Sequence, residues 1–288
     1  MISSSLKILQ VNLNKSQAAT ESALQVAIEL KVDLILVQEP WIYRQDQDSF
    51  EDCRSIQHSS FTQTYPRDRT RRPRTLVYVS KDFKPLVSLA PSSSDDLDIQ
   101  VIDIIEGRSK IQLLNIYNEA DQSGQGSRTL DRALFSLQLY KDSIVLGDFN
   151  THHPWWDPLV KSSQGASELV AWIEDNRLSL LNSPGKATFF RPNLARPSVL
   201  DLTLATSSLA SRTSYWQLLP NLGSDHLGIL LSLQGTNTTL VDSPLEIERF
   251  DTQNADWDLF KSTLQSSLKL DLSSLKDLVS QRSSLETL

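Results

Sequence analysis

The stretch from residue 143 to 156, SIVLGDFNTHHPWW, has the most informative chemistry in this sequence. An apolar run stops at Gly147, and Asp148 and Asn150 follow in the expected turn, which therefore contains a carboxylate and a carboxamide. Other apolar runs also end in or adjoin polar side chains, and these are Asn12, Glu39, Tyr117, Asp201, Asp225 and His226. Apolar strands that each finish in a polar group predict a pocket rich in oxygen atoms.

Such a pocket suits the hydrolysis of a phosphodiester. The reaction needs neutralised charge on the non-bridging oxygens, an aligned and deprotonated water, and help for the leaving oxygen. Magnesium prefers oxygen ligands and keeps several waters, so carboxylates with an amide suit it better than zinc. A single Asp or Asn at a strand end is more often a turn former, so the prediction depends on the whole set.

His152 and His153 do not predict a zinc site. Neighbouring residues on an extended segment point to opposite sides, and no second histidine pair or cysteine pair supplies further ligands. We expect both histidines to pack with Trp155 and Trp156 under the loop that holds Asp148.

The elements that must position the polar residues alternate between strands and helices. Apolar and β-branched runs predict strands at residues 6–12, 34–38, 75–80, 99–105, 110–117, 144–149, 199–205, 215–220 and 227–233. Helical spacing predicts helices over residues 17–30, 128–140 and 165–176. This mixture favours an α/β fold of stacked layers.

Length and composition fit a globular protein. The 288 residues, 39% of them apolar and 22% charged, suit one large domain or one domain with an appendage. No run approaches the roughly 18 apolar residues of a membrane helix, and MISSSLKILQ lacks the organisation of a signal peptide. We therefore expect an intracellular protein, nuclear or cytoplasmic, with no membrane partner. A single cysteine, Cys53, excludes an intramolecular disulfide and a cysteine-based zinc site.

The charge is unevenly distributed. The net charge of -7 argues weakly against nucleic-acid binding, but residues 236–288 alone hold nine acidic and five basic side chains. In the segment YPRDRTRRPRT, five arginines accompany one aspartate. Such an excess is typical either of a surface that binds a polyanion or of a solvated loop.

The composition changes near residue 235. GTNTTLVDSP is a polar connector, and scattered leucines in Ser-rich, acidic surroundings follow it. We predict a domain over residues 1–235 and a connector with a partly helical tail over residues 236–288.

In sequence order, QVNLNKS, LVQEPW, NIYN, LGDFNTHHPWW, ATFF, VLDLTLA and GSDHLGI resemble the motifs of the endonuclease/exonuclease/phosphatase superfamily. The resemblance covers about residues 5–235, and GDFN and SDH are its specific motifs. HHPWW after GDFN, and the RPR turn before a strand, are more similar to the endonuclease domain of non-LTR (LINE-type) retrotransposon reverse transcriptases. The segment ERFDTQNADWDLF resembles the stretch that leads to the reverse transcriptase, which makes that downstream region of a longer polypeptide an expected partner.

The resemblance implies a DNase I-like fold, a four-layer sandwich of two mixed β-sheets flanked by helices. It implies a magnesium-dependent endonuclease, with manganese as a substitute, that nicks one strand of duplex DNA. The nick would leave a 3′-hydroxyl for target-primed reverse transcription. Two alternatives stay open: an abasic-site endonuclease or other phosphoesterase of the superfamily, and a catalytically inactive remnant that binds DNA or a partner.

The resemblance also implies residue roles. Glu39 is the principal metal carboxylate, with Asn12 in the metal and phosphate shell and Asp225 supporting the metal waters. Asp148 orients and deprotonates the attacking water, and Asn150 holds that water or a phosphate oxygen.

The remaining catalytic roles fall on three residues. Asp201 accepts a hydrogen bond from His226 and favours its charged form, which faces the scissile phosphate. Tyr117 donates to a phosphate oxygen or assists the leaving group. The residues expected to contact DNA are Arg191, Arg196, Thr188, Ser224, Arg71 and Arg72.

Overall fold

The computed structural model describes residues 5–44, 50–91, 96–119, 129–191, 196–235, 258–259 and 261–263. The chain divides into two compact units, Met1–Asp242 and Ser243–Leu288. In the second unit the described residues, 258–259 and 261–263, are helical. The predicted connector and tail otherwise lie outside the described residues.

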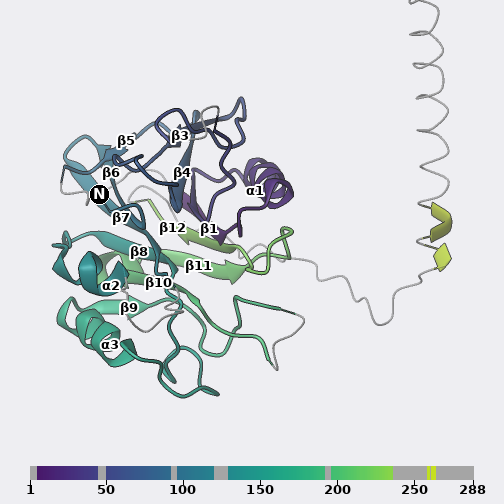
Figure 1. The fold of residues 1–288 in the computed structure, drawn as a ribbon. Coiled ribbons are helices and arrows are strands. Elements are labelled where there is room, and N and C mark those ends of the chain that lie inside the picture. The colour runs from purple at the N-terminus through teal and green to yellow at the C-terminus, as the bar shows by residue number, and fades with distance from the viewer. Residues whose placement is uncertain are drawn as a thin grey trace, which may run out of the picture. The chain divides into compact units, whose positions relative to one another are not determined.

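Two six-stranded mixed sheets form the first unit (Figure 1). One sheet has the order β11-β12-β1-β2-β4-β3, with β1 (Leu6–Asn12), β2 (Leu34–Gln38), β3 (Phe61–Thr64), β4 (Thr75–Ser80), β11 (Thr213–Leu218) and β12 (Ile229–Leu233). The other has the order β5-β6-β7-β8-β10-β9, with β5 (Leu86–Leu89), β6 (Ile99–Glu106), β7 (Ser109–Tyr117), β8 (Ser143–Asp148), β9 (Leu178–Leu180) and β10 (Asp201–Thr206). In the described strands, parallel pairing is confined to β1–β2 and β7–β8.

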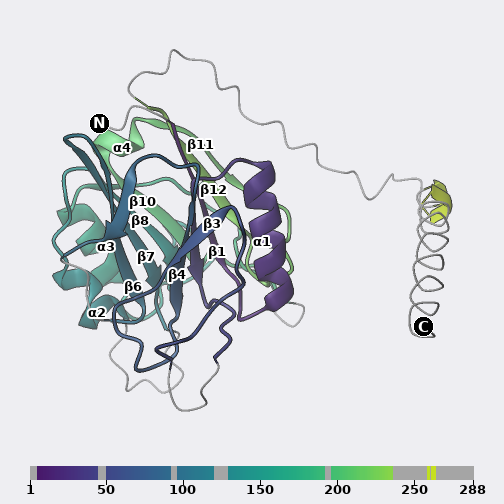
Figure 2. The same cartoon turned by 90° about the horizontal axis from the view of Figure 1, so that it is seen from above.

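Helices cover the outer faces of both sheets. The helical elements are α1 (Gln17–Glu29), α2 (Thr129–Arg132), the 3-10 turn η1 (Leu134–Ser136), α3 (Ala166–Asp175) and α4 (Ser207–Ala210). Figure 2 shows α1 beside the first sheet, and α2 and α3 beside the second. Separate apolar clusters pack α1 on the first sheet and α3 on the second. These layers confirm the predicted fold class. Among the described helices, none has the length and apolar character needed to cross a membrane.

The predicted helix over residues 128–140 is wrong. The chain forms only the four residues of α2 and the three of η1, and Leu137 is already extended. Arg132, the last residue of α2, donates to the carboxylates of Asp96 and Asp98. These tertiary contacts override the helical spacing of the sequence. The short strands β3, β5 and β9 were also missed, because three or four residues are too few to establish a periodic pattern.

The space between the sheets changes character along the strands. Residues that point into it alternate with residues that point outward, and on β1 the inner ones are Leu6, Ile8, Gln10 and Asn12. On β8 they are Ile144, Leu146 and Asp148. The aliphatic members belong to one buried cluster shared by both sheets. The polar members therefore gather at one edge of the sandwich.

Candidate active site

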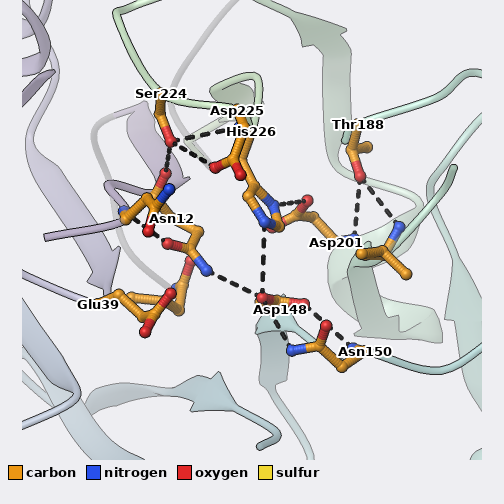
Figure 3. A network of polar contacts seen from close by, with 12 residues as sticks. Asn12, Glu39, Asp148, Asn150, Thr188, Asp201, Ser224, Asp225 and His226 are labelled. Atoms are coloured by element: carbon orange, nitrogen blue, oxygen red, sulfur yellow. Dashed lines mark hydrogen bonds and ion pairs between the residues drawn. The ribbon is translucent and has the colours of Figure 1, made fainter. Parts of the chain in front are cut away.

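Strand ends from both sheets meet at this edge (Figure 3). Asn12 ends β1, and Glu39 follows β2 in the first sheet. In the second sheet Asp148 ends β8, where it is the register partner of both Tyr117 on β7 and Asp201 on β10. The structure thus brings together side chains that lie up to about two hundred positions apart in the sequence.

Gly147 allows β8 to approach β7 closely just before Asp148. Its φ is 150°, and a Cβ atom built on it would lie 1.9 Å from the carbonyl oxygen of Ile116. Any larger residue would push the two strands apart and displace Asp148. The glycine of the GDFN motif is therefore required by backbone packing.

His226 lies between two buried aspartates. Its Nδ1 is 2.8 Å from Asp201 Oδ2, and its Nε2 is 3.8 Å from Asp148 Oδ2. The imidazole packs against the ring of Phe189 at a centroid distance of 4.7 Å. Asp201 fixes the orientation of the imidazole, so that Nε2 is directed at Asp148.

The two aspartates and the burial of the site set its protonation states. Burial raises the pKa of Asp148 to about 7, although the His226 cation opposes this rise. Burial lowers the pKa of His226, but Asp201 and then Asp148 outweigh burial and raise it to about 9. Near neutral pH His226 is therefore a cation, while Asp148 is poised to gain or lose a proton.

Amide groups orient the carboxylate of Asp148. Asn12 Nδ2 donates to Asp148 Oδ2 at 2.9 Å, and Asn150 Nδ2 donates to the same oxygen at 3.1 Å. The backbone N–H of Asn150 donates to the other oxygen at 3.1 Å. Asn150 has a φ of 44°, in the left-handed region, and its Nδ2 also donates to the carbonyl of Asn118. This strained turn holds the asparagine against the aspartate.

Glu39 lies across the site on the first sheet. It too has a left-handed backbone, with a φ of 44°, and its N–H donates to the carbonyl of Arg74. Lys15 contacts it twice: the Lys15 ammonium lies 2.6 Å from Glu39 Oε1, and the Lys15 N–H donates to the Glu39 carbonyl at 2.8 Å. The Glu39 carboxylate is therefore a cation-binding group in this structure.

The residues at this position fit a magnesium ion that keeps most of its waters. Within the described ranges, no three His, Cys, Asp or Glu side chains lie close enough to hold a metal by themselves. Glu39 supplies one carboxylate, and Asn12 lies at the end of the neighbouring strand in register with Gln38. One or two carboxylates, with water and substrate phosphate, are the usual ligands of protein-bound magnesium. Asp225 instead forms an ion pair with Arg191 at 2.8 Å.

A cleft of about 580 Å³ opens over these groups. Its lining includes Asn12, Glu39, Tyr117, Asp148, Asn150, Asp225, His226 and Arg191. Burial raises the pKa of Tyr117, and the charges of Glu39 and Asp148 add to this rise. Tyr117 therefore keeps its proton and can donate a hydrogen bond into the cleft.

Thr188 and Ser224 face the interior. Thr188 is fully buried, and its hydroxyl oxygen accepts from the N–H groups of Leu200 and Asp201 at 3.1 and 3.0 Å. Ser224 donates to the carbonyl of Asn12 at 2.7 Å and accepts from the N–H of His226. Their burial does not fit the predicted direct contact with DNA. Both hold the backbone beside functional residues instead.

The predicted DNA-contacting arginines differ in position. Arg191 lines the cleft and is 58% exposed, whereas Arg196 lies near the buried Asp157 at 3.5 Å and is absent from the cleft lining. Arg71 is exposed, and Arg72 is partly buried and donates to the carbonyl of Pro40.

Two cations of the cleft were missed in the sequence, Lys15 and Arg74. Arg74 forms ion pairs with Asp98 and Glu119 and lies over the ring of Tyr117. The sequence did offer a signal for Arg74. This residue directly precedes β4, and β4 begins beside the end of β2, which Glu39 follows.

The HHPWW segment packs beside the loop that follows Asp148. Trp155 differs from the prediction because it is partly exposed. Trp156 is fully buried, its Nε1 donates to the carbonyl of Thr151, and its ring packs on His153. Trp155 is 38% exposed, and its ring packs on that of Trp156. The segment therefore braces the loop that follows Asp148, as predicted for Trp156.

Comparison with known proteins finds one family model that matches part of the chain. Residues 111–230 match the family described as endonuclease-reverse transcriptase. No curated protein sequence matches the chain. Among solved structures, the endonuclease domain of TRAS1, a telomere-specific non-LTR retrotransposon, is 20% identical with a TM-score of 0.64, and the match covers 81% of this chain and all of that one.

Two further solved structures have similar folds. The AP endonuclease LMAP from Leishmania major is 14% identical with a TM-score of 0.59, over 80% of this chain and 88% of that one. The APE2 catalytic domain from Xenopus laevis is 15% identical with a TM-score of 0.57, and the match covers 80% of this chain and 92% of that one. These structures share the fold of this chain, and the family-model match over residues 111–230 agrees with the resemblance of the motifs. The chain has the DNase I-like fold of the endonuclease/exonuclease/phosphatase superfamily, and its residues 111–230 match the endonuclease-reverse transcriptase family.

Proposed function

We propose that this chain is a magnesium-dependent DNA endonuclease that nicks one strand of duplex DNA and leaves a 3′-hydroxyl for target-primed reverse transcription. The observation that carries the proposal is His226 held between Asp148 and Asp201, opposite Glu39 and Asn12 at one cleft. An acid–base pair beside a cation-binding carboxylate supports phosphodiester hydrolysis.

In the proposed reaction Asp148 takes a proton from the attacking water. A pKa of about 7 suits a general base near neutral pH, and the amides of Asn12 and Asn150 orient the carboxylate. Asn150 also holds the water or a phosphate oxygen. The orientation of Asp148 therefore directs the water toward the phosphorus atom.

Cationic His226 stabilises the negative charge that develops on the phosphate oxygens. Asp201 keeps the imidazole charged and correctly turned. Tyr117 donates a hydrogen bond to a phosphate oxygen or to the leaving oxygen. His226 and Tyr117 thus act on the phosphate, and Asp201 acts through His226.

Glu39 and Asn12 would hold magnesium, with Asp225 supporting its waters. Bound there, magnesium supplies charge neutralisation for the phosphate oxygens. Lys15 must release the Glu39 carboxylate for this to happen. Manganese, which also prefers oxygen ligands, is expected to substitute.

The proposed substrate is duplex DNA. Arg191 at the cleft and the exposed Arg71 are the side chains best placed to meet phosphates, and Arg72 and Arg196 are proposed as further DNA contacts. The proposal includes a reverse transcriptase region downstream in a longer polypeptide, after the connector and tail that follow residue 235. An enzyme of this kind acts inside the cell, in the nucleus or the cytoplasm.

A plasmid nicking assay tests the proposal. Supercoiled DNA is incubated with the parent chain, with and without magnesium, and with Asp148→Ala and His226→Ala. We expect relaxed circles only with magnesium and the parent chain, and ends that a polymerase can extend. Nicking that persists in EDTA, or in both folded variants, would contradict the proposal.

A second candidate is an abasic-site endonuclease, which the fold similarity to an AP endonuclease favours. A matched oligonucleotide pair, with and without one abasic site, separates the two functions. Preference for intact DNA supports the retrotransposon-type activity, whereas cleavage confined to the abasic strand supports repair. Stabilisation by magnesium against heating with no cleavage of either DNA would identify an inactive binding remnant.

A further inference from the structure

Gln10 lies on β1, two residues before Asn12, in the layer between the sheets. Its side chain is fully buried. Its Nε2 donates to Asp201 Oδ1 at 3.0 Å and to Gln38 Oε1 at 2.6 Å. The contact with Asp201 joins the two sheets directly behind the cleft, and none of the roles proposed above uses it.

The contact divides the two oxygens of Asp201 between two partners. Oδ1 accepts from Gln10, and Oδ2 faces Nδ1 of His226 at 2.8 Å. A carboxylate held by one oxygen can still turn about its Cβ–Cγ bond, whereas one held by both oxygens cannot. Gln10 therefore restricts the rotation of the group that orients His226.

Gln10 is itself anchored to the frame of the first sheet. Gln38 Nε2 donates to Asn115 Oδ1 at 2.6 Å. Asn115 Nδ2 donates to the carbonyls of Val37 and Leu76, both at 3.2 Å. The chain of amides thus ends on the backbones of β2 and β4, so the position of Gln10 is set by rigid elements.

Gln10 has a cost in stability beside its two hydrogen bonds. Gln10 Oε1 has no hydrogen-bond partner in the described part of the chain, although it is buried. A buried polar atom without a partner costs free energy that an aliphatic side chain would avoid. On the same strand, the inward positions of Leu6 and Ile8 are aliphatic.

We infer that Gln10 is a positioning residue for the Asp201–His226 pair. It holds the Asp201 carboxylate so that His226 Nε2 faces the scissile phosphate. The inference rests on the proposed nuclease function. It adds a residue of the first sheet to the support of the Asp201–His226 pair, whose own members lie on β10 and before β12.

The kinetic test compares Gln10→Leu with Gln100→Leu. Gln100 is a second fully buried glutamine of the same layer. It donates to the carbonyl of Thr64 and accepts from Asn115 Nδ2 at 3.5 Å, without touching Asp201. For Gln10→Leu we expect kcat for nicking to fall roughly ten- to a hundredfold, with KM within about twofold. For Gln100→Leu, kcat stays within about twofold of the parent value even where the melting temperature falls.

A double-mutant cycle separates positioning from general loosening. If Gln10 acts through Asp201, adding Gln10→Leu to Asp201→Asn causes little further loss of kcat. Losses that multiply, or equal losses in Gln10→Leu and Gln100→Leu, would overturn the inference.

Proton NMR of metal-free protein gives a readout that does not need activity. The sequence has four histidines, and a hydrogen-bonded imidazole N–H resonates far downfield of ordinary amides. We expect a signal that is lost in Asp201→Asn, shifted or broadened in Gln10→Leu, and unchanged in Gln100→Leu. An unshifted signal in Gln10→Leu would refute the inference. If the parent chain cuts no DNA, the proposed function fails while this signal still decides the role of Gln10.

Discussion

The layer between the two sheets has two ends that share the same strands and differ in what fills them. At one end, residues such as Ile8, Leu36 and Ile144 form a continuous aliphatic cluster. At the other, the same strands place buried amides and carboxylates beside the cleft. Aliphatic burial stabilises the fold, whereas each buried carboxylate costs free energy unless a partner compensates it. The residues that stabilise the fold and the residues proposed to act on the substrate therefore lie at opposite ends of the same strands.

The largest contrast is expected from Asp148→Asn at the polar end. Nicking should fall by about a thousandfold or more because the general base is lost. Thermal stability should hold or rise above pH 7, since burial disfavours the Asp148 anion that the amide replaces. Nicking rates and calorimetric melts of the same preparation check both parts. A large fall in melting temperature would mean that Asp148 also stabilises the fold.

The converse change is Leu146→Ala at the aliphatic end. We expect a loss of about 3 kcal/mol in unfolding free energy, because a fully buried side chain leaves a cavity. The nicking rate per folded molecule should stay within about twofold of the parent rate. Urea unfolding measures the first quantity, with Leu159→Ala, which is 84% exposed, as the control. If Leu146→Ala and Leu159→Ala lost equal unfolding free energy, the aliphatic end could not be the part of the layer that stabilises the fold.

Target choice should depend on the segment between Thr188 and Asp201, which carries Arg191 and Arg196. Arg191→Ala with Arg196→Ala is expected to redistribute the cleavage ladder on plasmid DNA, changing the use of individual sites by about tenfold. The control is Arg108→Ala with Arg177→Ala, two exposed arginines that precede β7 and β9 at the end away from the cleft. An unchanged ladder in the first pair would show that Arg191 and Arg196 form only surface ion pairs.

The smallest effect concerns Asp33, at the end away from the cleft. Burial raises its pKa from 3.8 to about 6, and the hydrogen bond from the N–H of Lys7 only partly offsets this. Because the folded protein disfavours the anion, stability should fall as pH rises from about 4 to about 6 and then level off. Asp33→Asn should therefore add about 1 kcal/mol at pH 7.5 and almost nothing at pH 4.

Unfolding measured at both pH values tests this prediction. Asp82→Asn, which makes the same charge change on an exposed side chain, is the control. A gain that is equal at the two pH values would point to a cause other than the ionisation of Asp33.

Much of the candidate site could be predicted from local sequence. An apolar run followed by a polar residue marks a strand end, and Asn12, Tyr117 and Asp148 lie at such ends in the structure. The two buried hydroxyl residues could not be placed this way. Thr188 and Ser224 flank the site in sequence, but their hydroxyls turn inward to backbone groups, which depends on the packing of distant segments.

The sequence by itself determined which strands end in polar residues, the α/β character of the fold and the residue types of the pocket. These follow from hydrophobic patterns and motifs that extend over a few residues. Only the tertiary structure decided which groups touch. The contacts of Asp201 with Gln10 and His226 depend on sheet register and on the spacing between the sheets, both fixed by packing of the whole domain. A hydrogen bond tolerates only a few tenths of an ångström of change in its donor–acceptor distance, and no local pattern specifies distances that finely.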